Sequence, residues 1–506
     1  MKKIFNNRYI ILILIIIAVT ALLTVLFPES VYARPGGGHG YHGGGGGYHS
    51  GGYHGGGYHG GGGDGLSLIY CLINYPVPTI IVLLIFGAFY YFSKSKYTNL
   101  GFSSAPTRIN IMTNNMQRDT MLSSLKSSDP NFSVPIFLDY ASLLFTKMHL
   151  FIGNDRLKEI QPFFSATIDK WSNYDISEVV IGSANIVSVA NDTQRETYKK
   201  ITKIVVEFRA NYTARAKSNG SVFRCNTIEK WQFVREAGAV SPVPEGMGVL
   251  KCPCCGAPAE FTDSGECKHC GNLVSQTNNA WIVNAVTIVS NERVKTSDII
   301  TYSAEVGTNY ATIYDNKLRE REPEFAALHN NMGYYTFEQN VAVPYFLDIY
   351  KLYSNLQWNQ ARHLLSDRLW QSMNYWIQFC RDYGCRNVLD NVTIQKVDTV
   401  KYESDKYYDS VTVRIFAWCY DYYVDNSGKL IAGNNRQART FSEYWTFVSR
   451  KGVSLENKST SCCPNCGAPA DRMGQAGVCG YCGSKITDGN FSWVLFSITQ
   501  DEEYEG

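Results

Sequence analysis

The sequence predicts a mixed α+β protein in which two tandem domains follow N-terminal hydrophobic segments. We expect each domain to hold a helix pair and a curved antiparallel sheet, with a cysteine hairpin inserted before the last strand. A paired-cysteine motif occurs twice, and its surroundings repeat in the same order. Val134-Pro135 answers Val343-Pro344 at an offset of 343 − 134 = 209, and Trp281 answers Trp493 at 493 − 281 = 212. A repeated order with a nearly constant offset indicates a duplicated unit.

The first 33 residues carry a targeting or membrane signal. A short basic start precedes an apolar run from Tyr9 to Phe27, and Val31-Tyr32-Ala33 has small residues at cleavage-type positions. Residues 1–33 are therefore either a signal peptide or a first transmembrane helix. Both interpretations export the residues that follow.

Residues 34–65 consist almost wholly of Gly, His and Tyr. Such a segment buries too little apolar surface to offset the entropy of ordering its backbone. We expect a disordered, flexible spacer. Its five histidines leave open a weak capture of Zn²⁺ or Cu²⁺ outside the membrane. They are His39, His42, His49, His54 and His59.

Residues 66–92 form a second hydrophobic span, which we predict to be a transmembrane helix. Pro76 and Pro78 interrupt its start, so the turns on both sides are needed to cross about 30 Å of hydrocarbon. Lys94 and Lys96 follow directly. The positive-inside rule then places the C-terminal side in the cytosol. The prediction is an integral membrane protein whose C-terminal domains face the cytosol.

Cysteine usage agrees with that compartment. Eight of the 15 cysteines belong to the paired motifs. An odd and scattered remainder indicates free thiols in a reducing environment. The remaining seven are Cys71, Cys225, Cys254, Cys380, Cys385, Cys419 and Cys462.

After a linker at 93–125, the first unit spans residues 126–290. Apolar residues from Phe132 to Phe151 repeat at three and four, which predicts a first helix. Asn154-Asp155 can cap a second helix from Leu157 to Trp171. The hydrophobic period then becomes two, as in strands of a curved antiparallel sheet. The expected strands are 179–189, 201–214, 222–234 and 281–289.

The second unit repeats this order over residues 336–500. A linker at 291–335, with a charged joint at 320–324, separates it from the first unit. The same periodicity predicts helices at 341–356 and 358–379. The expected strands are 392–400, 409–424, 438–449 and 492–499.

Two cysteine hairpins, residues 250–273 and 461–485, are predicted to be zinc ribbons. Paired Cys-x-x-Cys turns bring four thiolates to the corners of a tetrahedron, which suits a closed structural Zn²⁺ site. A catalytic zinc keeps one position open for water, so four thiolates favour structural zinc. The predicted ligands of two structural ions are Cys252, Cys255, Cys267 and Cys270 in the first hairpin, and Cys463, Cys466, Cys479 and Cys482 in the second.

Three further residues stand beside these ligands. Cys254 and Cys462 can substitute for a ligand or act as redox thiols, or they are spare cysteines tolerated in a reducing cytosol. His269 lies inside a pair, at a spacing that does not suit a site with four thiolates already present.

The helical segments Phe132–Trp171 and Val341–Trp376, each followed by a long sheet ending in a Trp-containing strand, resemble the Tim-forty-four-like domain. This resemblance implies a cone-shaped α+β fold shared with nuclear-transport-factor-like domains. A Cys-Pro-x-Cys-Gly-Ala-Pro hairpin behind a Gly-rich segment and a membrane span is similar to bacterial membrane proteins of this class. The resemblance thus implies a bacterial cell membrane. A tandem copy departs from the usual single domain, so the family's partner is not carried over.

Composition and motifs argue against two classes of function, nucleic-acid binding and catalysis. With 47 basic and 45 acidic residues, the chain has no field that would steer nucleic acid. It contains no phosphate-binding loop, zinc-protease motif or nucleophile elbow. The histidines of the two units, His149, His329 and His363, stand alone in the sequence. We therefore expect no enzyme, although paired ionisable residues converging inside a cone would favour one.

Two functions remain. The first is a membrane-tethered, non-catalytic scaffold that binds a protein partner or the inner face of the bilayer. The second is a lipid-binding or small-molecule-binding sensor that uses the cone cavities. Trp231, Trp281, Trp445 and Trp493 are expected either in the core or on the walls of such cavities.

Overall fold

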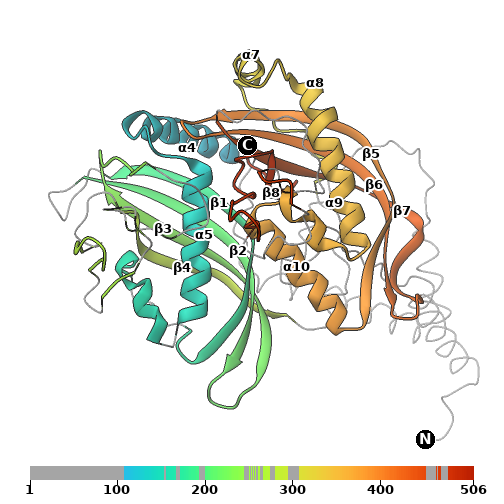
Figure 1. The fold of residues 1–506 in the computed structure, drawn as a ribbon, viewed down its shortest axis with the longest axis horizontal. Coiled ribbons are helices and arrows are strands. Elements are labelled where there is room, and N and C mark those ends of the chain that lie inside the picture. The colour runs from blue at the N-terminus through green and yellow to red at the C-terminus, as the bar shows by residue number, and fades with distance from the viewer. Residues whose placement is uncertain are drawn as a thin grey trace, which may run out of the picture. The chain divides into compact units, whose positions relative to one another are not determined.

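Segments in which apolar and polar residues alternate form two four-stranded sheets in the computed structural model (Figure 1). From Met112 onward the described residues belong to one compact unit of the chain. The predicted segments 1–33, 34–65 and 66–92 lie outside the described residues. The structure describes residues 108–152, 155–166, 171–192, 200–243, 250, 252, 255, 257, 260–262, 266–273, 280–294, 307–451, 463, 465–468 and 477–506.

The first sheet has the order β1-β2-β3-β4, and each neighbouring pair is antiparallel. Buried and partly exposed residues alternate along β2, so one face of the sheet forms the core. Three register shifts in the β1–β2 pair bend the sheet, as β-bulges do. The strands are β1 (Tyr174–Asp192), β2 (Ile201–Ala216), β3 (Val222–Glu236) and β4 (Ile282–Val294).

The second sheet repeats this order as β5-β6-β7-β8, again antiparallel throughout. Three register shifts fall between β5 and β6. The strands are β5 (Cys385–Ser404), β6 (Tyr408–Asp425), β7 (Leu430–Arg450) and β8 (Val494–Gln500). The mixed α+β prediction with two antiparallel sheets is thus confirmed.

Helix α5 (Val134–Phe151) crosses the first sheet. It begins with Pro135 in its first turn, where a missing N–H breaks no helical bond. Phe137 and Phe145 of α5 pack on Phe233 and Trp231 of β3, with ring centroids 5.3 and 5.2 Å apart. These contacts bury the apolar face that the sequence periodicity predicts.

The second helix predicted for this unit is wrong over its described residues. Two short 3₁₀ turns, Asp155–Glu159 and Gln161–Phe163, stand where a helix from Leu157 was expected. Pro162 has no N–H for a continuing helix. The chain then extends so that Phe164 bridges Val283 of β4. Here, pairing with a distant strand is favoured over the local helix propensity.

The C-terminal unit keeps both of its helices. A single π-helical turn (Glu338–Ala342) leads into α9 (Val343–Ser354), at the point where Pro344 lacks an N–H. A 3₁₀ turn (Trp358–Leu364) then precedes α10 (Asp367–Asp382). The ranges predicted as linkers hold helices as well: α4 (Arg108–Ser128), α7 (Leu318–Leu328) and α8 (Tyr334–Phe337).

Helix α10 also joins the two sheets. It contacts β1 of the first sheet as well as β5 and β8 of the second. The first core extends across the same joint, because it includes Tyr408, Val448 and Phe496 of the second sheet. The described parts of both units therefore share packed side chains.

One sequence prediction needs correction. In the ranges that the structure describes, no helix is both long and apolar enough to cross a membrane. This finding contradicts the predicted localisation, an integral membrane protein with C-terminal domains facing the cytosol.

Candidate metal centres and buried polar pairs

Each cysteine tetrad lies between the last two strands of a sheet. The first falls between β3 and β4, and the second falls between β7 and β8. Tight turns hold the cysteines: the N–H groups of Gly271, Gly467 and Gly483 each donate to the carbonyl of a cysteine four residues earlier, at 2.8 to 2.9 Å. All three glycines have φ between 70° and 75°, a conformation that other residues rarely adopt.

The four sulfurs of each tetrad lie within 4.8 Å of one another. In the first tetrad the Sγ atoms of Cys252 and Cys270 are 3.9 Å apart, as are those of Cys255 and Cys267. In the second, the Cys463–Cys482 and Cys466–Cys479 distances are 3.8 Å. A tetrahedral ion with Zn–S bonds of about 2.3 Å requires S···S edges of about 3.8 Å. Both tetrads could hold a metal ion, and their geometry fits zinc.

Hydrogen-bond donors reach the sulfurs of Cys270 and Cys482 and favour their thiolate forms, whereas the pKa values of Cys255 and Cys466 are raised by the neighbouring cysteines. The side-chain amide of Asn272 donates to Cys270 at 3.5 Å, and that of Asn465 donates to Cys482 at 3.6 Å. The backbone N–H of Asn272 lowers the pKa of Cys270 to about 7. The Ser484 hydroxyl lowers the pKa of Cys482 to about 6.

His269 takes part through its backbone, since its N–H donates to the sulfur of Cys267 at 3.4 Å. Cys254 and Cys462 lie outside the described residues, so their role stays a prediction.

The core of the first unit contains a fully buried pair of ionisable residues. His149 of α5 and Glu229 of β3 are both 0 % exposed, and Nε2 lies 3.1 Å from Oε1. The Trp231 indole N–H and the Thr227 hydroxyl also donate to Glu229, at 2.8 and 2.9 Å. His149 stood alone in the sequence because its partner lies 80 positions away.

This pair is the kind of convergence that would favour an enzyme, so its access to solvent decides its meaning. Aromatic rings enclose the imidazole, with Phe145 at 4.2 Å and Trp171 at 4.9 Å between ring centroids. Both side chains have satisfied hydrogen bonds and no exposed surface. A general acid or base has to reach its substrate directly or through one water. The geometry therefore favours a structural role for the pair.

Of the other two histidines, His329 has an acidic partner and His363 is affected by burial. His329, at the end of α7, places Nε2 3.0 Å from Oδ2 of Asp409. His363 lies in the 3₁₀ turn before α10, where burial lowers its pKa to about 4. A shared Glu-x-Trp motif, Glu229/Trp231 and Glu443/Trp445, was the sequence signal that could have located the buried carboxylates.

A comparison with known families finds a match within the second unit. Residues 324–460 match the family model of the Tim44-like domain, the family that the sequence resembles. The match covers α8, α9 and α10 and the strands β5, β6 and β7. It supports a Tim44-like domain protein. A search of curated proteins found no match to the chain.

Proposed function

We propose that the chain is a non-catalytic, protein-binding scaffold in which two structural Zn²⁺ ions fix the cysteine hairpins. Four sulfurs at tetrahedral distances leave no open position for a substrate. The match to the Tim44-like domain favours a binding module. The observation that carries the proposal is the outward face of the second sheet, which already holds another segment of the chain.

The interior positions argue against the alternative, a small-molecule or lipid site inside the cones. Trp231 and Trp445 are both 0 % exposed. Phe208 and Phe346 pack against these indoles, with ring centroids 5.5 and 5.1 Å away. Large side chains thus fill the space that a ligand would need.

The outward face of the second sheet is rich in aromatic side chains. Along β6, Phe416, Trp418, Tyr420 and Tyr422 are partly exposed, whereas the alternate residues are core. The rings of Trp418 and Tyr420 stand 5.9 Å apart at 76°, which makes a notch instead of a flat platform. We call these four residues the aromatic row.

The first sheet carries polar residues at the same positions. Phe208 pairs with Glu229 and Ile415 pairs with Glu443, so the registers of β2 and β6 can be superposed. On this basis the row corresponds to Arg209, Asn211, Thr213 and Arg215 of β2. The aromatic character is therefore specific to the second sheet and is no requirement of the fold.

A segment of the chain, residues 307–315, already lies on this face and begins with a turn at Gly307–Tyr310. Arg414, one step along β6 from the aromatic row, donates to the carbonyls of Gly307 and Tyr310 at 3.0 and 2.8 Å. The Tyr444 hydroxyl accepts the N–H of Ile313 at 3.1 Å. The aromatic row continues this docking surface beyond the segment. We therefore assign it to an extended polypeptide of a partner protein.

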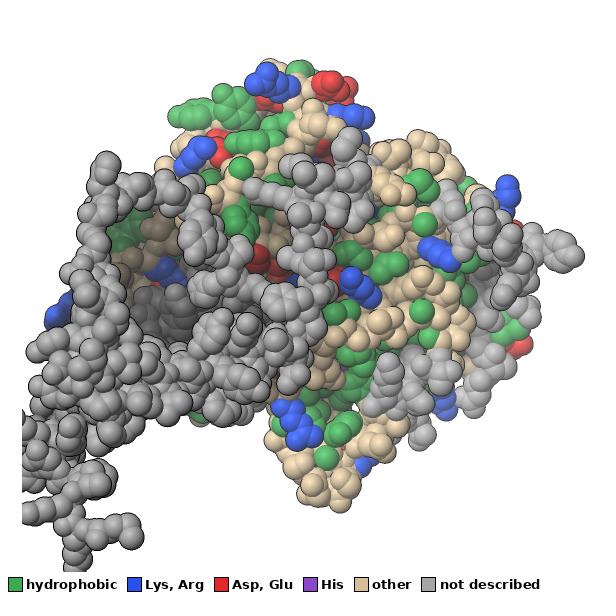
Figure 2. Space-filling model, turned by 180° about the vertical axis from the view of Figure 1, so that it is seen from behind, with side chains coloured by type: hydrophobic (Ala, Val, Ile, Leu, Met, Phe, Trp, Pro, Cys, Tyr) green, Lys and Arg blue, Asp and Glu red, His purple; other side chains and the backbone are tan. Residues whose placement is uncertain are grey.

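The charges beside the row favour a partner segment without high net charge. Asp390 and Lys396 of β5 are both exposed next to it, with opposite signs. On the face seen in Figure 2, the described acidic and basic side chains are likewise interspersed. A nucleic acid would need a continuous basic groove.

A binding comparison tests the proposal. The full chain is immobilised and exposed to lysate, as wild type, as Trp418→Ala/Tyr420→Ala, and as a matched control, Thr213→Ala/Arg215→Ala. Aromatic anchors at an interface are each worth about 2 kcal/mol or more, so the row variant should bind its partner at least about tenfold more weakly. The control on the first sheet should bind like the wild type.

Equal binding by all three chains would reject the aromatic row. Native mass spectrometry of the wild type tests the rest. Two bound Zn²⁺ ions with no other mass agree with a scaffold. A co-purified small molecule would favour the alternative, and fewer than two ions would mean that a hairpin has been misinterpreted.

A further inference from the structure

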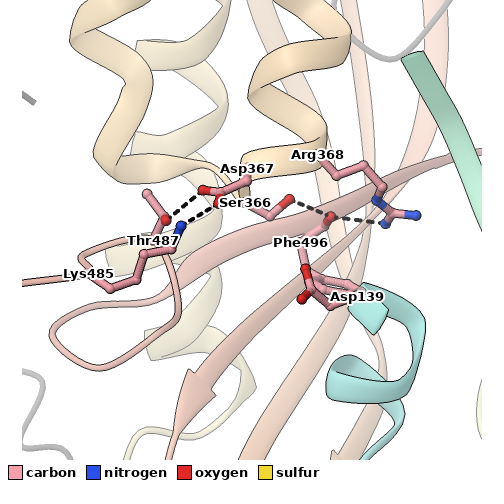
Figure 3. A pocket seen from close by; sticks show the side chains of 7 residues that line it. All are labelled: Asp139, Ser366, Asp367, Arg368, Lys485, Thr487 and Phe496. Carbon is pink, nitrogen blue, oxygen red and sulfur yellow. Dashed lines mark hydrogen bonds and ion pairs between the residues drawn. The ribbon is translucent and has the colours of Figure 1, made fainter. Parts of the chain in front are cut away.

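The first turn of α10 is tied to the second cysteine hairpin (Figure 3). The carboxylate of Asp367 forms an ion pair with Lys485 and accepts a hydrogen bond from the Thr487 hydroxyl at 2.8 Å. Lys485 and Thr487 follow the ligand Cys482 within five positions. Asp367 also pairs with Arg362, in the 3₁₀ turn before α10. One carboxylate therefore joins the helix to the return strand of the hairpin.

The charges at this joint hold the carboxylate in its ionised form. Burial alone would raise the pKa of Asp367, but Arg362 and Lys485 hold it below its ordinary value. Packing is equally close: a Cβ added to Gly477, whose φ is +63°, would lie 2.4 Å from the Thr487 hydroxyl. The hairpin return can thus move little without moving its partners.

The same turn of α10 is held by β8 on its other side. The Ser366 N–H donates to the carbonyl of Leu495 at 3.0 Å, and its hydroxyl donates to that of Phe496 at 3.1 Å. Arg368 reaches the same Phe496 carbonyl at 3.4 Å. The start of α10 therefore sits between the hairpin and the last strand.

The rest of α10 lies against the first sheet. The guanidinium of Arg224, on β3, stacks over Phe379 and Tyr375 of α10, at 4.2 and 5.5 Å from the ring centres. Val180 of β1 belongs to the same core as α10. A displacement of α10 would therefore reach the joint between the two sheets.

The first hairpin has a different attachment. Its Phe261 packs edge-on against Phe163, with ring centroids 5.5 Å apart. Among the described residues of this hairpin, none forms an ion pair with a helix. Among its described residues, this unit also has no helix equivalent to α10. The two hairpins thus have the same arrangement of sulfurs but different contacts with the rest of the protein.

We infer that metal occupancy of the second hairpin, and not of the first, fixes the position of α10 and with it the joint between the two sheets. This inference rests on the proposed zinc sites. Without an ion, the four thiolates repel and the turns that carry Lys485 and Thr487 lose their fixed geometry. Asp367 then loses its partners on the hairpin side. Loss of the metal ion would thus loosen the attachment of α10, a helix of 16 residues, and act as a conformational signal.

Hydrogen exchange of the full chain tests this, with the zinc content of each sample measured in parallel. Chelation of wild type with EDTA should speed exchange of the α10 amides at least about tenfold, because local opening becomes easier. Cys463→Ser, which removes a ligand of the second hairpin, should do the same. Cys252→Ser should lose one ion and leave α10 unchanged. Unchanged α10 exchange in metal-free wild type would overturn the inference.

A third variant tests the route. Lys485→Met/Thr487→Val keeps all four cysteines and should retain two ions, yet its α10 exchange should no longer respond to EDTA. A response as large as in wild type would reject the Asp367 connection. Two ions in wild type with an insensitive α10 reject this inference alone, whereas fewer than two ions reject the proposed zinc sites themselves.

Discussion

The two sheets each bury a glutamate at the equivalent position, but the hydrogen-bond partners of the two carboxylates differ. Glu229 of β3 and Glu443 of β7 are both 0 % exposed, and each accepts a hydrogen bond from the indole of the tryptophan two residues later, at 2.8 and 2.9 Å. In the first unit the other partners are His149 and the Thr227 hydroxyl, at 3.1 and 2.9 Å. In the second, the partners are the Tyr350 hydroxyl at 3.3 Å and the Gln500 amide at 3.4 Å. One core position is thus stabilised by an ionisable partner in one copy and by neutral donors in the other.

The hydrogen bonds of His149 define its protons. Nδ1 lies 2.9 Å from the carbonyl of Phe145, which can only accept, so Nδ1 carries a hydrogen. Nε2 and Glu229 then share one further proton, either as imidazolium with carboxylate or as imidazole with carboxylic acid. In both forms the pair is neutral as a whole, which makes its burial tolerable.

The largest expected difference between the copies comes from removing these partners. His149→Leu should destabilise the first unit by about 3–5 kcal/mol, because it leaves a buried carboxyl without its ionisable partner. Tyr350→Phe should cost the second unit only about 1 kcal/mol, since it removes one neutral hydrogen bond. Urea unfolding followed by tryptophan fluorescence measures both.

A matched variant separates the proton from the packing. Glu229→Gln combined with His149→Leu removes both members of the pair and should recover part of the loss, because no buried carboxyl remains. Equal costs for His149→Leu and Tyr350→Phe would show that the two carboxylates are stabilised alike, contrary to this comparison.

The second difference concerns pH. The bridges Phe164–Val283 and Leu365–Leu495 are equivalent, and they align His363 with Pro162, which cannot titrate. Burial lowers the pKa of His363 from 6.5 to about 4. The unfolded chain therefore binds more protons between these values. The contribution of His363 to the free energy of unfolding is complete above pH 6.5 and falls by about 3 kcal/mol as the pH drops to 4.

The measurement is a comparison of unfolding free energies of wild type and His363→Leu at pH 4 and pH 7. The variant should lose less stability on acidification, by about 3 kcal/mol. Other groups titrate in the same range, and the difference between the two chains cancels their effect. An identical pH dependence would mean that His363 is solvated in the folded state.

The sequence allowed the sheets and the cysteine sets to be predicted, because both depend on local spacing. Alternation located all eight strands, although β5 and β7 extend well beyond the predicted 392–400 and 438–449. Bulges explain part of the difference in β5: the register shifts between Asp390 and Thr393 and between Ile394 and Lys396 break the alternation that the prediction used.

Features that depend on contacts far apart in the chain could not be predicted. In the described part of the first unit, the second helix is replaced because Phe164 pairs with Val283, 119 positions later by 283 − 164. Apolar residues at helical spacing gave no sign of that competition. The pairing of His149 with Glu229 was invisible for the same reason, although Glu229 itself lies in a repeated motif.

The smallest expected difference tests whether α10 gives the second unit a helix start that the first lacks. Ser366 caps α10: its side chain accepts the Leu369 N–H at 3.3 Å. Its counterpart, Ser165, follows the equivalent bridge and is exposed, and neither it nor Ala166 is helical. Ser366→Ala should therefore destabilise the chain by about 1 kcal/mol, as the loss of an N-cap does. Ser165→Ala should stay within about 0.5 kcal/mol of wild type. Thermal unfolding of both variants measures the contrast, and equal effects would mean that the cap contributes nothing beyond the strand bridge that the two serines share.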